Sequence, residues 1–163
     1  MILRALLASD RSVLADMLAR TDHFTAAEVA LALELIDAAI ADPTCGYEFV
    51  VATLPDHTVA GYICWGATPI TQASYDLYWL VVDETMRRRG IGRALCIAME
   101  QRIWAAGGGN IRLETSGKAH YAATVQFYER VGYHIAARLQ DFYAPGDDLV
   151  LLYKRLVRAG DTA

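Results

Sequence analysis

The sequence predicts an α/β (α+β) fold with a mixed, mostly antiparallel central sheet of about seven strands, flanked by four helices. Runs of alternating apolar residues, typical of strands, interchange with runs whose apolar residues recur every three or four positions, typical of helices. Short turns join neighbouring strands near both ends of the sheet, whereas helices separate strands in its middle. With 55% hydrophobic residues and no linker or repeat, residues 1–163 are expected to form a single domain.

The N-terminal segment is expected to contain one strand and one helix. The apolar run "MILRALL" predicts a strand over residues 1–7, and "RSVLADMLAR" predicts a helix over residues 11–20. Ser9 and Asp10 lie immediately before this helix, and either side chain could accept the unpaired amide hydrogens of its first turn. We therefore expect one of these two residues to be the N-cap.

A second helix has recognisable signals at both ends. Thr25 and Glu28, in "TAAE", form a capping-box pattern in which each side chain accepts a backbone amide of the other residue. Apolar residues then recur at the spacing of one buried helix face. The helix should end near Asp42, because the residue before Pro43 avoids helical backbone angles.

The rest of the chain alternates between strands and helices. Alternating apolar residues predict six further strands, over residues 47–54, 59–67, 75–82, 110–116, 133–143 and 148–156. The turns "PDHT" and "APGD" join the first two and the last two of these strands as hairpins. A third helix is expected from Gly90 to the glycines at 107–109, and a fourth over 122–131 with Gly132 as its C-cap.

Charge and composition exclude several classes of function. The formal net charge of -4 argues against binding nucleic acid through bulk electrostatics. No apolar run reaches the length of about 20 residues that spans a bilayer, so we expect no membrane contact. The N-terminus shows no export signal, and Cys45, Cys64 and Cys96 form no CxxC pair, which favours a reduced, cytoplasmic protein. The histidines show no metal-ligand spacing with the cysteines, so no metal is expected.

A basic segment with two glycines follows the strand over 75–82 and opens the third helix. Its residues are Arg87, Arg88, Arg89, Gly90, Ile91, Gly92 and Arg93. A helix N-terminus exposes unpaired amide groups and about half a positive charge, and glycine lets a phosphate approach them closely. Arginine side chains can pair with the outer oxygens. The segment therefore predicts a site for a diphosphate, although the arginines alone would also fit a solvated loop.

A dinucleotide-binding fingerprint does not account for this segment. The third glycine of GxGxxG is replaced by Leu95, and residues 83–89 separate the strand from Gly90. The fingerprint requires its first glycine directly after the strand. The pattern that fits the segment is Arg-x-x-Gly-x-Gly after an apolar strand.

This pattern, formed by Arg87, Gly90 and Gly92, resembles the acetyl-CoA-binding motif of the GCN5-related N-acetyltransferase (GNAT) family. The segment "FYERVGY" (127–133) is similar to that family's Tyr-x-x-x-Gly-Phe signature, with Tyr133 in place of phenylalanine. The order of strands and helices also matches over most of the chain. The resemblance implies the acyl-CoA N-acyltransferase fold, acetyl-CoA as co-substrate and direct transfer of an acetyl group to a primary amine.

The resemblance also implies roles for individual residues. Backbone groups of Leu80 and Val82 would pair with the pantetheine arm as an added strand does, and amides of the basic segment would hold the pyrophosphate. The implied cofactor-binding set is Leu80, Val81, Val82, Arg87, Arg88, Arg89, Gly90, Ile91, Gly92, Arg93, Tyr121 and Phe127. Tyr121 replaces an asparagine that is frequent in the family, which leaves its contact open.

Two residues are candidates for the chemistry. Asp76 lies eleven residues before Arg87, similar to the base in some relatives, and on a strand of period two it shares a face with Leu80. Tyr128 matches the tyrosine that would donate a hydrogen bond to the departing thiolate. Simpler interpretations stay open: Asp76 as a solvated strand start, and Phe127 and Tyr128 as core aromatics, with Phe127 the more inward residue.

The acceptor stays open between a small-molecule amine or amino acid and a protein terminus or lysine. Glu28, Glu34 and Asp37 would attract a cationic amine or form a solvated face, and "DFYAPGDD" (141–148) would border the acceptor pocket. His120 precedes a helix and could reach the cleft, although a place at the surface near the helix start is favoured. The alternatives to an enzyme are a non-catalytic acyl-CoA-binding or sensing domain and a nucleotide-binding regulatory fold. The resemblance allows a homodimer, although the sequence shows no interface.

Overall fold

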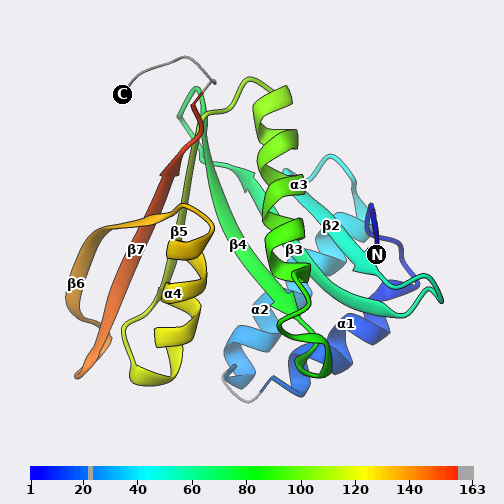
Figure 1. The fold of residues 1–163 in the computed structure, drawn as a ribbon, viewed down its shortest axis with the longest axis horizontal. Helices are drawn as coiled ribbons and strands as arrows, with labels where there is room; N and C mark the ends of the chain where they lie inside the picture. Colours follow the sequence, from blue (N-terminus) through cyan, green and yellow to red (C-terminus); the bar gives the residue numbers. More distant parts are fainter. Residues whose placement is uncertain (22–23, 158–163) are drawn as a thin grey trace.

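The computed structural model describes residues 1–21 and 24–157, which form a sheet covered by helices (Figure 1). The strands are β1 (Ile2–Arg4), β2 (Tyr47–Thr53), β3 (Val59–Ala67), β4 (Ser74–Val82), β5 (Asn110–Ser116), β6 (His134–Ala144) and β7 (Asp147–Arg155). The helices are α1 (Asp10–Ala19), α2 (Ala26–Ala41), α3 (Ile91–Ala105) and α4 (Ala122–Arg130), with short 3₁₀ turns η1 (Glu84–Met86) and η2 (Ala119–Tyr121). The predicted seven strands and four helices are confirmed.

The seven strands form one sheet in the order β1-β2-β3-β4-β5-β7-β6. Neighbouring strands are antiparallel except β4 and β5, which α3 connects as parallel neighbours. The two predicted hairpins, β2–β3 and β6–β7, are both present. Within the described ranges, no helix combines the length and apolar character needed to cross a membrane.

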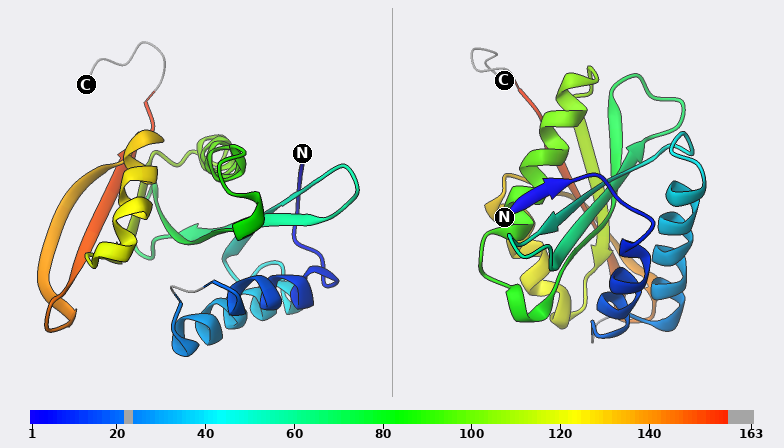
Figure 2. Two further views of the ribbon diagram at one scale, coloured as in Figure 1. Left: turned by 60° about the horizontal axis from the view of Figure 1, so that its bottom comes forward. Right: turned by 90° about the vertical axis from the view of Figure 1, so that its right-hand side faces the viewer.

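Apolar side chains cover both faces of the sheet. Leu95 and Met99 of α3 pack on one face in a core that includes Trp65 of β3. On the other face, Leu14 of α1 and Ile36 of α2 pack against residues of β2 and β3. Figure 2 shows α1 and α2 on the opposite side of the sheet from α3. The helices therefore hold the central strands between two buried layers.

The predicted capping signals of α2 are confirmed. The Thr25 hydroxyl accepts the amide of Glu28 at 3.2 Å, and Oε2 of Glu28 accepts the amide of Thr25 at 2.7 Å. The helix ends at Ala41, and Asp42 is extended as expected before Pro43. This reciprocal cap fixes the side chain of Glu28 at the start of α2.

The predictions for the N-terminal segment hold only in part. β1 is shorter than expected, and Ser9 is the N-cap residue of α1, as expected, but its backbone angles are helical and its side chain forms no capping bond. Asp10 caps nothing: its carboxylate turns back to Arg4, with two hydrogen bonds of 2.7 Å, and to the amide of Leu7 at 2.9 Å. For the carboxylate of Asp10, the charged guanidinium of Arg4 is a stronger hydrogen-bond donor than the neutral amides of the first helical turn. The sequence pattern of a helix cap gave no sign of this contact.

The carboxylate of Asp10 is only 3% exposed. Burial alone would raise its pKa, but the hydrogen bonds from Arg4 and Leu7 outweigh this effect, and the pKa is lowered from its usual value. The ion pair therefore stabilises the folded chain most when Asp10 is charged.

We expect Asp10→Asn to lower the free energy of unfolding by about 2 kcal/mol, because Arg4 would lose its charged partner. Denaturant titration at neutral pH measures the loss. Since the folded pKa is depressed, the difference from wild type should be complete above the unfolded pKa of about 3.9 and disappear as the pH falls through the folded value. In Asp37→Asn, where the lost pair with Arg11 is exposed, the change should stay below about 1 kcal/mol. Equal stability of Asp10→Asn and wild type would contradict the assignment.

Candidate active site

β4 and β5 are parallel neighbours that separate along their length. In the described chain, their pairing is confined to Ser74–Asp76 of β4 and 110–112 of β5. The two strands meet near the top of Figure 1 and diverge towards the bottom. A cleft of about 1120 Å³ opens where they separate, with walls from α2, β4, β5, η2, α4 and the start of β7.

The edge of β4 that faces this opening carries backbone groups turned away from β3. The amide of Asp83 donates to the carbonyl of Ala60 at 2.9 Å, so these two residues form a hydrogen-bonded pair of the antiparallel ladder. Because such pairs alternate, Val81 bonds to β3, while the N–H and C=O groups of Leu80 and Val82 point towards the opening. An extended ligand could pair with this edge as an added strand.

The open edge leads to the N-terminus of α3. Gly90 is the N-cap and has a φ of 79°, a left-handed conformation that suits glycine. A Cβ atom at Gly92 would lie 3.1 Å from the Phe127 ring. The first amides of α3 lack intrahelical acceptors and form an anion-binding terminus. The two glycines are therefore required by the turn and by the contact between α3 and α4.

Among the remaining residues of the implied cofactor set, the arginine side chains are exposed and the apolar side chains of Val81 and Ile91 are buried. Arg87 pairs with Glu84 at 3.0 Å, whereas Arg88, Arg89 and Arg93 are exposed and form no ion pair with any described residue. The side chains of Val81 and Ile91 are buried in the two cores, so these residues could contribute only through their backbones. The structure thus brings exposed guanidinium groups next to the N-terminus of α3.

A β-bulge in β4 changes which residues share a face. The register against β3 shifts at Tyr78, which is an extra residue between Leu77 and Trp79. The prediction that Asp76 lies on the same face as Leu80 is therefore wrong, because one inserted residue reverses the alternation of side chains. Leu77 packs with Leu80 in the core below α3 instead.

Asp76 lines the cleft on the face of the sheet away from α3. Its carboxylate accepts a hydrogen bond from Nε of Arg112, and Arg112 also lies 3.6 Å from Glu114. Asp76 is therefore held in an ion pair rather than exposed at a strand start. Arg112 and Glu114 were missed, because no sequence signal showed that their strand lies beside β4.

Tyr128 lies at the boundary between the core and the cleft. It is 5% exposed, lines the cleft and makes edge contacts with the rings of Phe127 and Tyr133 at 5.2 and 5.5 Å. Phe127 is only half-buried, so the expectation that Phe127 is the more inward residue is wrong: its ring packs sideways on Gly92. Burial raises the pKa of Tyr128 well above its ordinary value, so its hydroxyl stays protonated and can act as a donor.

The wide part of the cleft is lined by aromatic and charged side chains. The aromatic residues are Phe24, Tyr47, Tyr78, Trp79, Tyr121, Tyr128 and Tyr143. The charged residues are Glu28, Asp76, Arg112, Glu114, Lys118 and Asp147, and His120 lines the same space. The segment 141–148 contributes two of these residues, Tyr143 and Asp147, and its place beside an acceptor stays a prediction. Carboxylates outnumber the permanent cations, so the cleft is acidic.

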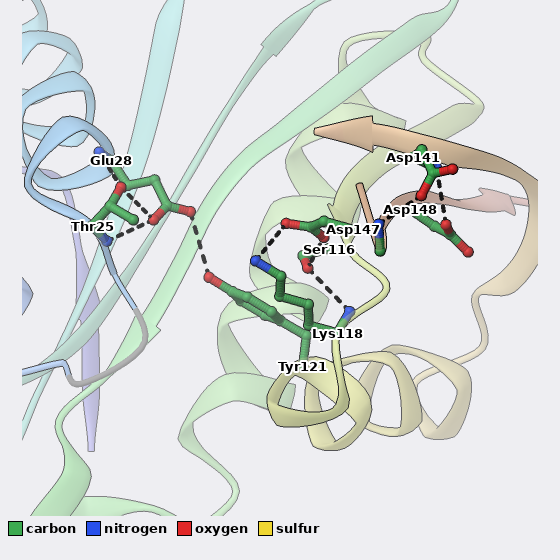
Figure 3. Close-up of polar contacts among 9 residues, drawn as sticks. Thr25, Glu28, Ser116, Lys118, Tyr121, Asp141, Asp147 and Asp148 are labelled. Carbon is green, nitrogen blue, oxygen red and sulfur yellow. Dashed lines mark hydrogen bonds and ion pairs between the residues drawn. The ribbon is translucent and has the colours of Figure 1, made fainter. Parts of the chain in front are cut away.

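Tyr121 and Glu28 face each other across this cleft (Figure 3). The hydroxyl of Tyr121 lies 3.4 Å from Oε1 of Glu28, and burial together with this carboxylate raises the pKa of Tyr121 to about 12. Tyr121 therefore reaches α2 on the wide side of the cleft, and its contact with the cofactor stays a prediction.

Asp147 forms a second polar cluster at the start of β7. Its carboxylate accepts hydrogen bonds from the Ser116 hydroxyl and, at 3.1 Å, from Nζ of Lys118 (Figure 3). The Ser116 hydrogen bond is the main cause of its lowered pKa. This cluster was missed, because it joins residues about thirty positions apart through the pairing of β5 with β7. Among the described residues, no group of three or more side chains could hold a metal ion.

Comparisons with known proteins agree with this architecture. A family model described as an acetyltransferase (GNAT) domain matches residues 45–135. A structure described as a GNAT-family acetyltransferase from Desulfovibrio desulfuricans is 37% identical, covers 96% of this chain and 99% of that chain, and has a TM-score of 0.91. The chain therefore belongs to the GNAT family and is an acyltransferase.

More distant structures share the fold. The aminoglycoside 6′-N-acetyltransferase from Enterococcus faecium is 21% identical, with 99% of this chain and 100% of that chain covered and a TM-score of 0.75. The ribosomal-protein-S18-alanine N-acetyltransferase from Escherichia coli is 18% identical, with 99% and 97% covered and a TM-score of 0.74. The search of curated proteins gave no match.

Tyr133 replaces the phenylalanine of the family signature, and its buried hydroxyl has no hydrogen-bond partner in the part of the chain that the structure describes. We expect Tyr133→Phe to leave the free energy of unfolding unchanged or to raise it by about 1 kcal/mol, because no hydrogen bond is lost. Tyr153→Phe is the matched control: its hydroxyl donates to Oδ1 of Asn110 at 2.6 Å, and its removal should cost about 1 kcal/mol. Denaturant titration compares the two variants, and a clear loss in Tyr133→Phe would refute the assignment.

Proposed function

We propose that this chain is an acetyl-CoA-dependent N-acetyltransferase that transfers the acetyl group directly to a primary amine of a small molecule, amino acid or protein. The observation that carries the proposal is the open edge of β4, which is followed, through η1 and the basic segment, by the N-terminus of α3 at Gly90. Related folds support the donor: one aminoglycoside 6′-N-acetyltransferase structure contains coenzyme A. A streptothricin acetyltransferase from Bacillus anthracis was solved with acetyl coenzyme A.

Residues 1–163 would act as one N-acetyltransferase domain, since strands from both ends of the chain belong to the same sheet. The free cysteines Cys45, Cys64 and Cys96 support a cytoplasmic location.

The coenzyme would bind along the open edge of β4. Backbone groups of Leu80 and Val82 would pair with the amides of the pantetheine arm. The amides at the start of α3 would hold the pyrophosphate, with Gly90 leaving room for its oxygens. The exposed guanidinium groups of Arg88, Arg89 and Arg93 would neutralise phosphate charge. Bound in this way, acetyl-CoA supplies the acetyl group as a thioester beside Tyr128.

The acceptor nitrogen must lose a proton before it can attack. An alkyl amine with a pKa near 10.4 is neutral in only about one molecule in a few thousand at pH 7. Asp76 is the carboxylate of β4 in the cleft, and it would receive this proton directly or through water. The pairing of Asp76 with Arg112 holds its carboxylate in place.

Tyr128 would stabilise the leaving sulfur. As the nitrogen–carbon bond forms and the carbon–sulfur bond breaks, negative charge develops on the thiolate. A protonated phenol can donate a hydrogen bond that strengthens with this charge. Burial keeps Tyr128 protonated at neutral pH, so it fits this role without full proton transfer.

Gly90→Ala should weaken the binding of coenzyme A about tenfold or more, because a side chain disfavours the left-handed turn that presents the amides of α3. Gly107→Ala is the matched control: it lies after the opposite end of the same helix, with a φ of 84° and similarly open surroundings. Both variants should lose about 1 kcal/mol of stability, but only Gly90→Ala should lose affinity. Calorimetry measures both affinities. A wild-type chain that folds but does not bind coenzyme A would disprove the proposed function.

Asp76→Asn should lower kcat about 10²–10⁴-fold if Asp76 is the base, and Tyr128→Phe about 10²-fold if Tyr128 is the donor. Release of free thiol from acetyl-CoA over a panel of amines measures turnover. Asp16→Asn, on the exposed side of α1, serves as the control and should behave as wild type. If both site variants keep full turnover, the catalytic roles are wrong. Binding of coenzyme A without turnover of any amine would favour a non-catalytic acyl-CoA-binding domain.

A further inference from the structure

The carboxylates of the cleft are not equally neutralised. Asp147 is paired with Lys118, and Asp76 shares Arg112 with Glu114. Glu28 is different: among the described residues its hydrogen-bond donors are the neutral groups of Thr25 and Tyr121, and it forms no ion pair. The α2 wall of the cleft therefore carries a negative charge that no cationic group of residues 1–21 or 24–157 neutralises.

Glu28 is also held in a fixed position. Its Oε2 accepts the amide and the hydroxyl of Thr25 at 2.7 and 2.8 Å, which anchors the carboxylate to the start of α2. Only Oε1 faces the cleft, where its contact with the Tyr121 hydroxyl is long at 3.4 Å. The capping box holds Glu28 at the start of α2, on a different wall of the cleft from Asp76 of β4 and Tyr128 of α4. It is available to a ligand at the α2 wall.

Two phenol rings complete this part of the cleft. Tyr143 belongs to an irregular part of β6. Residues 140–143 of this strand lie opposite a single residue of β7, Asp148. This stretch is held by the amide of Asp141, which donates to Asp148 Oδ1 at 3.0 Å, and by Asp141 Oδ1, which accepts the amide of Gly146 at 2.6 Å. The half-exposed ring of Tyr143 lines the same cleft as Glu28, Glu114 and Asp147, which belong to three different walls. Partial burial and these carboxylates raise the pKa of Tyr143. Aromatic rings beside a restrained carboxylate are typical of sites for organic cations.

We propose that the acceptor carries, besides the amine that reacts, a second cationic group that binds between Glu28, Tyr121 and Tyr143. This inference rests on the proposed function of the cleft. The second cation takes the place of the weak Tyr121 hydrogen bond at Oε1 of Glu28, while the reacting amine lies at Asp76 and Tyr128. Glu28 is then a residue that determines acceptor specificity and takes no part in proton transfer.

The test compares straight-chain monoamines with α,ω-diamines of the same length, using thiol release from acetyl-CoA. In the wild type, kcat/KM for the best diamine should be about tenfold or more higher than kcat/KM for the monoamine of the same length. The difference should come from a lower KM, and it should exceed the statistical advantage of having two amines that can react. Glu28→Gln keeps the capping box, since glutamine also fits this position, and removes only the charge. It should raise the KM of the diamine about tenfold at unchanged kcat and leave the monoamine unaffected.

Glu34→Gln is the matched control, because Glu34 is an exposed residue of α2 that does not line the cleft. It should retain the full preference for diamines, and thermal unfolding should show that both variants remain folded. The inference alone is overturned if the wild type shows no preference, if the preference survives in Glu28→Gln, or if that variant loses kcat equally on both classes of amine. Failure of the wild type to bind coenzyme A and to acetylate any amine would overturn the proposed function and this inference with it.

Discussion

The separation of β4 from β5 after their short parallel pairing is the constraint on which the rest of the structure depends. At the junction the two strands pair through their backbones, and the Asp76–Arg112 ion pair joins their side chains. Beyond the junction, each strand is held by its other neighbour, β3 or β7. Peptide groups left without a strand partner inside a sheet require another partner. The divergence therefore creates a binding edge without unfolding any element.

The bulge at Tyr78 gives this edge its two distinct sides. Before the bulge, Leu77 faces the core below α3 and Asp76 faces the cleft. After the bulge, Leu80 returns to the α3 side although it is three residues beyond Leu77. One strand can thus present a charged group to the cleft near the junction and backbone groups to the opening further along. In a regular strand with strict alternation, Asp76 and Leu80 would face the same side of the sheet.

Electrostatics differ at the two ends of the proposed active site. The start of α3 combines a helix N-terminus with three exposed arginines, which favours an anion. The wide part of the cleft is acidic and rich in aromatic rings, which favours a cation. Tyr128 lies at the boundary between them, where burial keeps its hydroxyl protonated. In the proposed reaction, substrates of opposite charge would approach from opposite ends and meet at this tyrosine.

The order of elements, the capping box of α2 and the position of the Arg–Gly segment could all be predicted from the residues alone, because hydrophobic period, caps and glycine turns are local properties of the chain. Only the tertiary structure decided the partners of Asp10 and Asp76, since both pair with arginines whose positions depend on how strands and helices meet. It also decided the bulge at Tyr78, because an inserted residue is visible only against the neighbouring strand. The contact between Glu28 and Tyr121 joins residues 93 positions apart, so no local pattern could have predicted it.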